Sequence, residues 1–270
     1  DLGYDDVLND FVLTENISGV TSLDVSYKSI SDLTGIEDFT ALLNLNCENN
    51  QLTSLGVSNN TALTILRCNE NSLTNLDVSS NTALTGLYCQ QNQLTALDVS
   101  NNTALDNLSC EVNQLTSLDV SSNTALTELR CNDNQLIHLN MKNGVTDALT
   151  FYATGNSLTC IEVKTEDVAY ATANWTSGNG NIDEGVEFSV VCVPEGYTYV
   201  PDNNFEQALI DLGYDDTLDD FLLTENISSV TSLDVSSKEI SDLTGIEDFT
   251  ALEILYCYYN QLTSLDLMAN

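Results

Sequence analysis

Six of the eight cysteines stand at a regular spacing, which tests them against three kinds of thiol chemistry. Cys47, Cys68, Cys89, Cys110 and Cys131 are 21 residues apart, and Cys257 follows Cys47 by 210 residues. A metal site needs converging thiolates, as in a C-x-x-C motif, and one thiol per 21 residues supplies none. A disulfide needs Cβ atoms about 3.5–4.5 Å apart, whereas parallel side chains in stacked coils are held farther apart than that. We therefore predict a ladder of buried free thiols, each in place of an inward leucine.

The other two cysteines lie outside this spacing and flank a segment that lacks the repeat. Cys160 precedes an inward Ile161 and so takes an outward position, and Cys192 follows 32 residues later. We expect a disulfide between them that closes a C-terminal cap and stabilises the fold by roughly 3–4 kcal/mol. Such a bond suits an oxidising compartment. Two unrelated free thiols remain the alternative.

The sequence offers little for catalysis. The single histidine, His138, takes a position where other repeats carry Ser, Asn or Ala, and we interpret it as an exposed substitution. No G-x-S-x-G, H-E-x-x-H or phosphate-binding glycine loop occurs. The column Asp77, Asp98 and Asp119 is most simply a solvated face. We expect a protein that is not an enzyme.

Two acidic stretches could supply oxygen ligands to calcium. They are "NGNIDEG", Asn179 to Gly185, and "DDTLDD", Asp215 to Asp220. Neither has the glycine and the final glutamate that an EF-hand loop carries at fixed positions. We therefore predict no metal and no cofactor, with calcium as a minor alternative in a cap or at a module junction.

The composition restricts the partners. The chain of 270 residues has 6 Lys and Arg against 41 Asp and Glu, a formal net charge of -35. Such a surface repels nucleic acid and anionic membranes, whose non-specific contacts depend on basic side chains. With 42% hydrophobic residues, the chain is expected to fold, and it contains no apolar run long enough to span a membrane.

The elements that position these residues follow from the 21-residue unit "LTxLxCxxNQLTxLDVSxNTA". Its L-x-C and L-D-V pieces alternate inward and outward as strands do, and the asparagine pieces between them supply turns. A single unit cannot bury its own apolar side, so the units must stack as parallel coils about 4.8 Å apart. The inward positions of one copy are Leu63, Leu66, Cys68, Leu73, Leu76 and Val78. The asparagine column, Asn50, Asn71, Asn92, Asn113 and Asn134, is expected to satisfy backbone groups of adjacent coils.

A longer period divides the chain into modules. "DLGYDDVLNDFVLTENISGVTSLDV" at residue 1 returns as "DLGYDDTLDDFLLTENISSVTSLDV" from Asp211. We predict a first module over 1–192, a linker over 193–201 that contains both prolines, and the start of a second module over 202–270. Within the first, 1–19 form a partial N-terminal cap, 20–163 the repeats and 164–192 the C-terminal cap. Because residue 1 lies inside a repeated unit, we expect a piece of a longer protein.

A short helix is expected to cap the second module. "DNNFEQALIDLG" has Asp202 as N-cap, Phe205, Leu209 and Ile210 at helical spacing, and Gly213 as a stop. The helix would shield the first coil from solvent.

The pattern L-x-x-L-x-C-x-x-N-x-L followed by L-x-x-L-D-V-x-x-N resembles bacterial leucine-rich repeats of the 21-residue nested (IRREKO) kind. Residues 30–45, "ISDLTGIEDFTALLNL", are similar to an internalin-type repeat. The resemblance implies a leucine-rich-repeat solenoid of parallel β coils, in the α/β class. It extends to tandem modules of large bacterial proteins exported by type IX secretion, which share the cap residues Thr159 to Val163, Ala173 to Trp175, Phe188 to Cys192 and Val200 to Gly213. It thereby implies a secreted or cell-surface location.

The two modules differ chiefly at outward strand positions. Between residues 31–60 and 241–270, Ser31 to Leu42 are unchanged, whereas Asn46, Glu48 and Asn49 become Tyr256, Tyr258 and Tyr259. In the first module the corresponding column includes Arg67, Tyr88 and Arg130. Arginine and tyrosine are favoured at recognition surfaces. These six Arg and Tyr residues are the predicted ligand-binding residues.

Two functions remain open. The first is a binding or adhesion module that recognises an extracellular protein or a polysaccharide through the exposed L-x-C strand face. The second is a tandem-repeat stalk or fibre whose modules contact only neighbouring modules of the same chain.

Overall fold

A computed structural model describes residues 3, 12–144, 149–265 and 267. The chain divides into two compact units, unit 1 over Asp1–Cys192 and unit 2 over Val193–Asn270. None of the described helices is long and apolar enough to cross a lipid bilayer.

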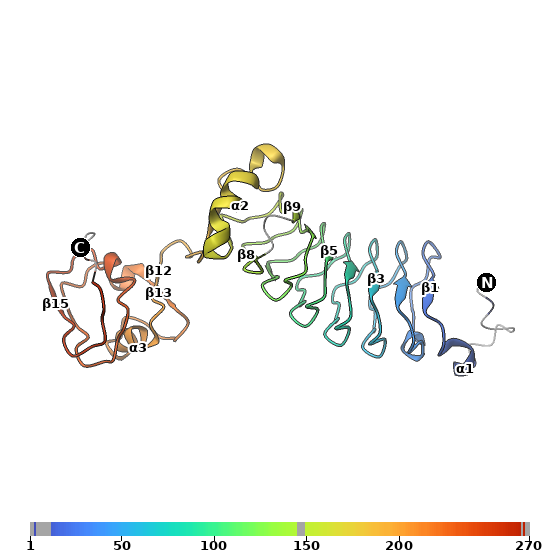
Figure 1. The fold of residues 1–270 in the computed structure, drawn as a ribbon, viewed down its shortest axis with the longest axis horizontal. Coiled ribbons are helices and arrows are strands. Elements are labelled where there is room, and N and C mark those ends of the chain that lie inside the picture. Colours follow the sequence, from blue (N-terminus) through green and yellow to red (C-terminus); the bar gives the residue numbers. More distant parts are fainter. Residues whose placement is uncertain (1–2, 4–11, 145–148, 266, 268–270) are drawn as a thin grey trace. The chain divides into compact units, whose positions relative to one another are not determined.

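Unit 1 is a solenoid built around a parallel seven-stranded sheet (Figure 1). Its strands, in spatial order, are β1 (Ser22–Asp24), β2 (Asn44–Asn46), β3 (Ile65–Arg67), β4 (Gly86–Tyr88), β5 (Asn107–Ser109), β7 (Glu128–Arg130) and β9 (Thr150–Tyr152). Six are L-x-C type strands, and β1 is an L-D-V strand that aligns with them. The predicted leucine-rich-repeat solenoid is confirmed.

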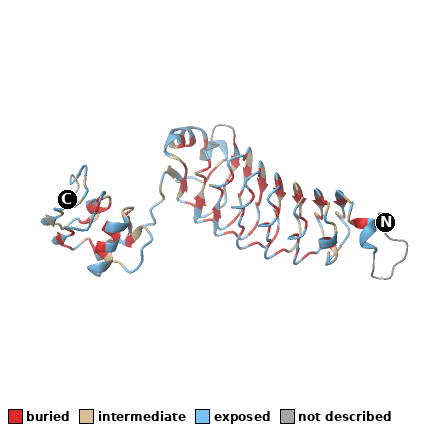
Figure 2. Cartoon of the chain, turned by 60° about the horizontal axis from the view of Figure 1, so that its bottom comes forward, coloured by how far each residue is buried: buried red, intermediate tan, exposed pale blue. Residues whose placement is uncertain are grey.

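The register of the sheet follows from the repeat length. Leu45 aligns with Leu66, and Leu66 with Leu87, so leucine stacks on leucine in every coil. All three are fully buried. Figure 2 shows the buried residues on the inner side of the coils and the exposed residues outside. Each buried leucine contributes about 1.5–3 kcal/mol, which offsets the ordering of a coil that has little other regular structure.

The asparagine column links each coil to its neighbours. Asn92 Nδ2 donates to the carbonyl oxygens of Cys68 and Cys89 at 3.0 and 3.1 Å, and its Oδ1 accepts the N–H of Leu73 at 2.9 Å. Asn71 and Asn113 make the same bonds one coil away. The column satisfies buried backbone groups that a turn would otherwise leave unpaired.

The L-D-V pieces form a second sheet only toward the C-terminal end of unit 1. Its order is β11 (Glu187–Ser189), β10 (Cys160–Glu162), β8 (His138–Asn140) and β6 (Ser117–Asp119). In earlier coils the same sequence buries its apolar residues, such as Leu55 and Val57, without a regular ladder. Burial of these side chains, more than hydrogen bonding, fixes this side of the solenoid.

The C-terminal cap covers the last coil of unit 1. It contains a 3-10 turn (Thr165–Asp167), α2 (Val168–Asn174), a second 3-10 turn (Ser177–Asn179) and β11. Trp175 is 4% exposed, and its ring lies 4.7 Å from that of Phe151 in β9 and 5.7 Å from that of Phe188 in β11. The aromatic cluster takes the place of the leucines that a further coil would supply. At the other end lie α1 (Thr14–Ile17) and a 3-10 turn (Ile36–Asp38).

Unit 2 begins with a helical cap, as the sequence predicts. Helix α3 spans Asn203–Asp211, and Asp202 Oδ1 accepts the N–H groups of Asn204 and Phe205 at 3.0 Å each. Phe205 and Leu209 are fully buried against the first coil. The remaining elements are β12 (Tyr197–Tyr199), β13 (Phe221–Leu223), a 3-10 turn (Thr224–Asn226), β14 (Ser232–Asp234), a 3-10 turn (Ile246–Asp248) and β15 (Ile254–Tyr256).

One part of the predicted linker has regular structure. Strand β12 pairs antiparallel with β13, and Thr198 and Val200 are buried, so the later part of 193–201 belongs to unit 2. The stretch from Val193 to Gly196 is exposed and contains the sole described connection between the units.

Candidate functional site

The strand face consists of the outward residues of the seven-stranded sheet, which fall into three columns. The first column is Asn44, Ile65, Gly86, Asn107, Glu128 and Thr150. The second is Asn46, Arg67, Tyr88, Ser109, Arg130 and Tyr152. The third, just beyond the strands, is Glu48, Asn69, Gln90, Glu111, Asn132 and Thr154. Register places each residue beside its counterparts in adjacent coils.

The predicted residues of unit 1 form part of two arginine–tyrosine pairs in the second column. The Arg67 guanidinium carbon lies 4.9 Å from the centroid of the Tyr88 ring, and that of Arg130 lies 5.1 Å from the Tyr152 ring. Each such contact is worth about 0.5–1 kcal/mol at an exposed site. Arg130 Nε also donates to Glu128, which raises the pKa of the Arg130 guanidinium. Both pairs are thus held in place before any ligand arrives.

Tyr152 is a member of this column that the sequence reasoning did not include. The coil that carries it is irregular, because Ala153 follows Cys131 by 22 residues instead of 21. The signal was present, since "FYATGN" has the spacing of L-x-C-x-x-N with Phe151 and Ala153 inward. Both of these side chains are buried.

Gly86 gives the Tyr88 ring its place on the sheet. A Cβ atom at position 86 would lie 3.1 Å from Tyr88 Cε2 and 3.6 Å from its hydroxyl oxygen, so the ring extends over the glycine. Other residues of the first column carry side chains there. The ring therefore lies along the strand, next to the Arg67 guanidinium.

The predicted tyrosines of unit 2 are strongly exposed. Tyr256, Tyr258 and Tyr259 are 47%, 55% and 85% exposed, and the last two rings meet edge to face at 5.4 Å. They follow β15 at the positions that Asn46, Glu48 and Asn49 have in unit 1. The two sets of predicted residues lie in separate units.

The cysteine ladder has no accessible thiol in unit 1. Its five members are fully buried, and burial raises the pKa of the Cys47 and Cys89 thiols to about 12. Cys110 Sγ donates to the carbonyl oxygen of Arg130 at 3.4 Å. A buried, protonated thiol is a poor nucleophile and a poor metal ligand. Cys257 in unit 2 is half-buried, because no described coil stacks beyond it.

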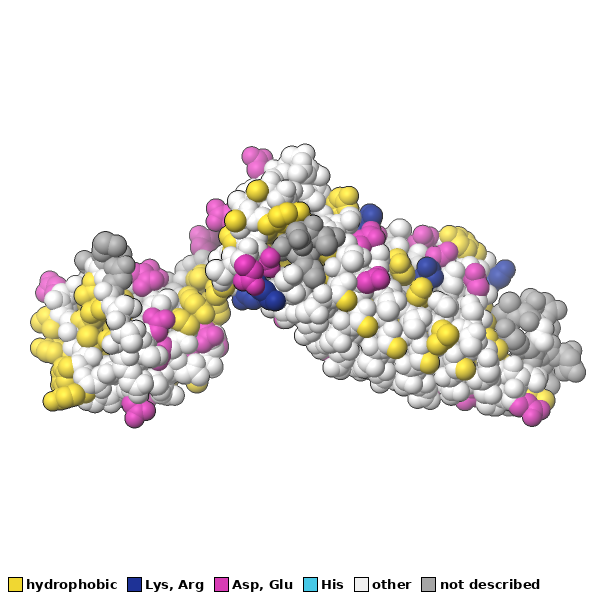
Figure 3. Space-filling model, viewed as in Figure 1, with side chains coloured by type: hydrophobic (Ala, Val, Ile, Leu, Met, Phe, Trp, Pro, Cys, Tyr) yellow, Lys and Arg dark blue, Asp and Glu magenta, His cyan; other side chains and the backbone are white. Residues whose placement is uncertain are grey.

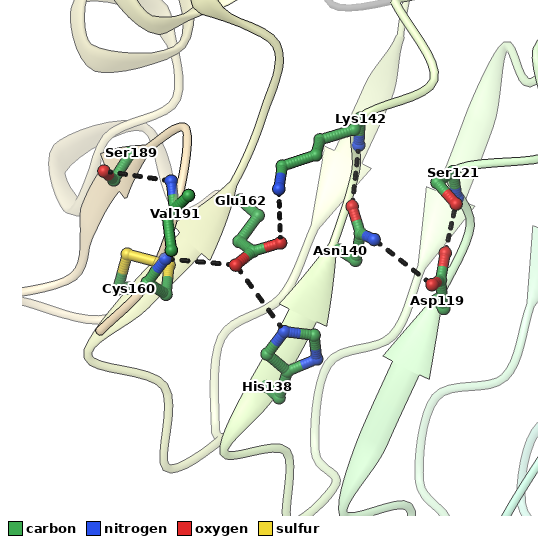
Figure 4. A network of polar contacts seen from close by, with 10 residues as sticks. Asp119, Ser121, His138, Asn140, Lys142, Cys160, Glu162, Ser189 and Val191 are labelled. Carbon is green, nitrogen blue, oxygen red and sulfur yellow. Dashed lines mark hydrogen bonds and ion pairs between the residues drawn. A yellow bond between two sulfur atoms is a disulfide. The ribbon is translucent and has the colours of Figure 1, made fainter. Parts of the chain in front are cut away.

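The predicted disulfide joins Cys160 to Cys192, and a buried glutamate sits beside it (Figure 4). Glu162 is 8% exposed, and its carboxylate accepts the Cys192 N–H at 3.0 Å and pairs with Lys142 Nζ at 2.9 Å. His138 Nε2 lies 3.9 Å away, with 46% of its side chain exposed. The network fixes the last residues of unit 1 to β10.

The two stretches considered for calcium are engaged in the fold. Asp183 accepts the N–H groups of Gly155 and Asn156 at 3.1 Å each, and Glu206 Oε1 accepts those of Asp219 and Asp220. Among the described residues, no group of three or more His, Cys, Asp and Glu side chains converges as a metal-ligand set.

The comparisons with known proteins point to one kind of repeat protein. No family model matches the chain. Internalin J of Listeria monocytogenes is 38% identical over 72 residues, which are 27% of this chain and 8% of that protein. The structure of the functional domain of InlJ from Listeria monocytogenes, which includes a cysteine ladder, matches with a TM-score of 0.54 and 29% identity, over 96% of this chain and 53% of that one.

The chain is an internalin-like leucine-rich-repeat protein. A leucine-rich-repeat protein of Leptospira interrogans shares the fold, with a TM-score of 0.50 and 17% identity over 94% of this chain and 58% of that chain. The internalin-like chain spans about half the length of these solved structures and under a tenth of the curated relative. Internalin-like repeats suggest a surface protein-binding module and leave its target open.

Proposed function

We propose that this chain is a non-enzymatic module, outside the cell or at its surface, that binds a protein through the strand face of unit 1. The arginine–tyrosine pairs support this most directly. Arg67 over Tyr88 and Arg130 over Tyr152 are ordered, partly exposed groups of the residue types that are enriched in binding hot spots. The disulfide suits an oxidising compartment.

The charge distribution agrees with a protein partner. Figure 3 shows few basic groups, each near carboxylates, on a surface that is otherwise neutral or acidic. Ordered side chains cost little entropy to bind, so a small number of contacts can carry the affinity. A polysaccharide ligand is the other outcome that a screen must distinguish.

The test is a binding screen against arrays of extracellular proteins and of glycans, with and without calcium. The variant combines Arg67→Ala, Tyr88→Ala and Arg130→Ala. A control variant combines Thr95→Ala and Gln114→Ala, which alter exposed residues off the strand face. We expect the first variant to lose at least tenfold in affinity and the control to lose none. Equal binding by both variants would refute the placement of the site.

A stalk is the second candidate, and the near-identical openings of two separately compact units favour it. A stalk needs uniform modules, whereas recognition needs modules that differ on the strand face. Sequencing the modules of the full-length chain decides between these outcomes. Uniform outward columns would support the stalk.

A further inference from the structure

Val112 has a backbone conformation that its side chain disfavours. Its φ is 57°, in the left-handed region, and a β-branched residue there is a genuine outlier. Every coil needs this conformation, because the N–H at this position bonds the carbonyl of the next coil, as Val112 N–H does with Asn132 at 3.1 Å. Other coils meet the need with residues that bear it at lower cost, such as Asn49 and Asp133.

Burial does not repay this strain. Val112 is 45% exposed and lies outside the hydrophobic core of unit 1. A left-handed residue costs roughly 1–2 kcal/mol, and an exposed valine recovers little of it. The folded unit therefore gains no stability from a valine at this position.

The same coil carries two acceptor atoms without donors. Glu111 Oε2 and Asn107 Oδ1 are inaccessible to solvent, and neither has a hydrogen-bond partner within the described structure. A buried polar atom left in this way costs about 1–3 kcal/mol. Burial raises the pKa of the Glu111 carboxyl, which reflects its poor solvation.

The centre of the face is also low and lacks a free cation. Ser109 is 4% exposed and stands in register between the larger Tyr88 and Arg130. Arg130 is held by Glu128, whose second oxygen accepts Asn107 Nδ2 at 2.6 Å. No cationic group among the described residues is hydrogen-bonded to Glu111.

We propose that the coil of β5 is the contact centre of the strand face and takes a protein segment in which a lysine or arginine stands beside an apolar side chain. The cation would bind at Glu111 and the apolar side chain would pack on Val112. This inference rests on the proposed function and deepens it. Charge complementarity supports the choice, because an acidic molecule with an unpaired carboxylate attracts a cation.

The test separates binding from stability. Val112→Gly relieves the strain, so we expect a higher melting temperature together with at least tenfold weaker binding. Glu111→Gln should weaken binding similarly. Gln91→Gly, at the equivalent left-handed position one coil earlier, is the control and should leave binding unchanged. If the valine were a neutral substitution, Val112→Gly would stabilise the protein without affecting affinity.

The probe is an array of short peptides that place Lys or Arg next to Leu, Val or Phe, measured on the whole chain at moderate salt. Matched peptides carry Glu in place of the basic residue, or separate the basic and apolar residues. The proposal requires that only the adjacent pairs bind, and that Val112→Gly and Glu111→Gln weaken them. If no such peptide binds, or if both variants bind normally, the proposal is wrong. Loss of binding in the Arg67, Tyr88 and Arg130 variant alone would leave the proposed function standing and overturn this inference.

Discussion

Single residues of the asparagine column decide whether a coil can join its neighbours. Asn92 Nδ2 lies within 3.0 and 3.1 Å of two carbonyl oxygens, and only a donor is compatible with both. An isosteric carboxylate would place negative charge against two acceptors. The column is therefore intolerant of the smallest possible chemical change.

We expect Asn92→Asp to lower the free energy of unfolding by about 3–5 kcal/mol at neutral pH. The folded state would raise the pKa of the new carboxyl, so the loss is present above that pKa and shrinks as the pH falls through it. Denaturation at neutral and acidic pH measures this. Asn101→Asp, at an exposed position, is the control and should change stability little.

Glu111 gives a second pH-dependent effect at this scale. Its folded pKa is raised, chiefly by burial, so ionisation of Glu111 destabilises the folded state at neutral pH. We expect Glu111→Gln to melt higher than the wild type at neutral pH, and the difference to vanish below about pH 4.3, the ordinary range of glutamate. Glu70→Gln, which loses the bond from Asn49 Nδ2, should not stabilise. A pH-independent difference for Glu111→Gln would contradict this account.

Spacing makes some residues of the site predictable and leaves others hidden. A 21-residue period is enough to place Arg67 beside Tyr88, because equal coils put equal positions in register. Tyr152 escapes because one extra residue breaks the period. The strain at Val112 and the unpaired Glu111 oxygen depend on backbone torsion and burial, which letters alone do not encode.

At the scale of elements, the cap of unit 1 depends on a covalent closure. The disulfide joins β10 to Cys192, and Glu162 reinforces the same junction. Helix α2 is short and has no described side-chain cap bond, so it contributes little stability of its own.

Reduction of Cys160–Cys192 should destabilise unit 1 by about 3–4 kcal/mol, because a separation of 32 residues is then no longer closed. Thermal melts with and without reductant measure the shift. The variant Cys160→Ser with Cys192→Ser should melt low in both conditions. Hydrogen exchange should show the loss first in the cap, and a uniform loss over all coils would argue against a local closure.

The elements also differ in how far sequence foretells them. Helix α3 is predictable because its cap residue, its apolar spacing and its stop are all local. Strand β12 is not, since its partner β13 lies more than twenty residues away along the chain. The missing ladder of the early L-D-V pieces is equally invisible, because their sequence matches that of β6.

At the scale of the whole molecule, the two units should be separable by one cut. Glu195 lies in the exposed stretch between them, and the disulfide is confined to unit 1. Brief digestion with a glutamate-specific protease should cut first after Glu195 and release two folded fragments without reductant. Mass spectrometry identifies the site. A first cut within the coils would show that the stretch is protected.

Net charge gives the second effect at this scale. With a net charge of -35, self-repulsion opposes the compact state, and the neighbouring Asp77 raises the pKa of Asp98 against its bonds to Ser100. Salt screens such repulsion over about 10 Å at 0.1 M. We expect the melting temperature to rise between low and moderate salt. A fall would mean that attractive pairs dominate instead.

The asparagine column also has a consequence for heredity. Each coil makes the same bonds to the coil before it, so a whole coil can be removed or added without leaving an unpaired group inside. The gene segments that encode such coils are nearly identical, and recombination between them keeps the reading frame in multiples of one coil. Length variants of this protein should therefore fold, and a lineage can change the reach of its solenoid in a single generation.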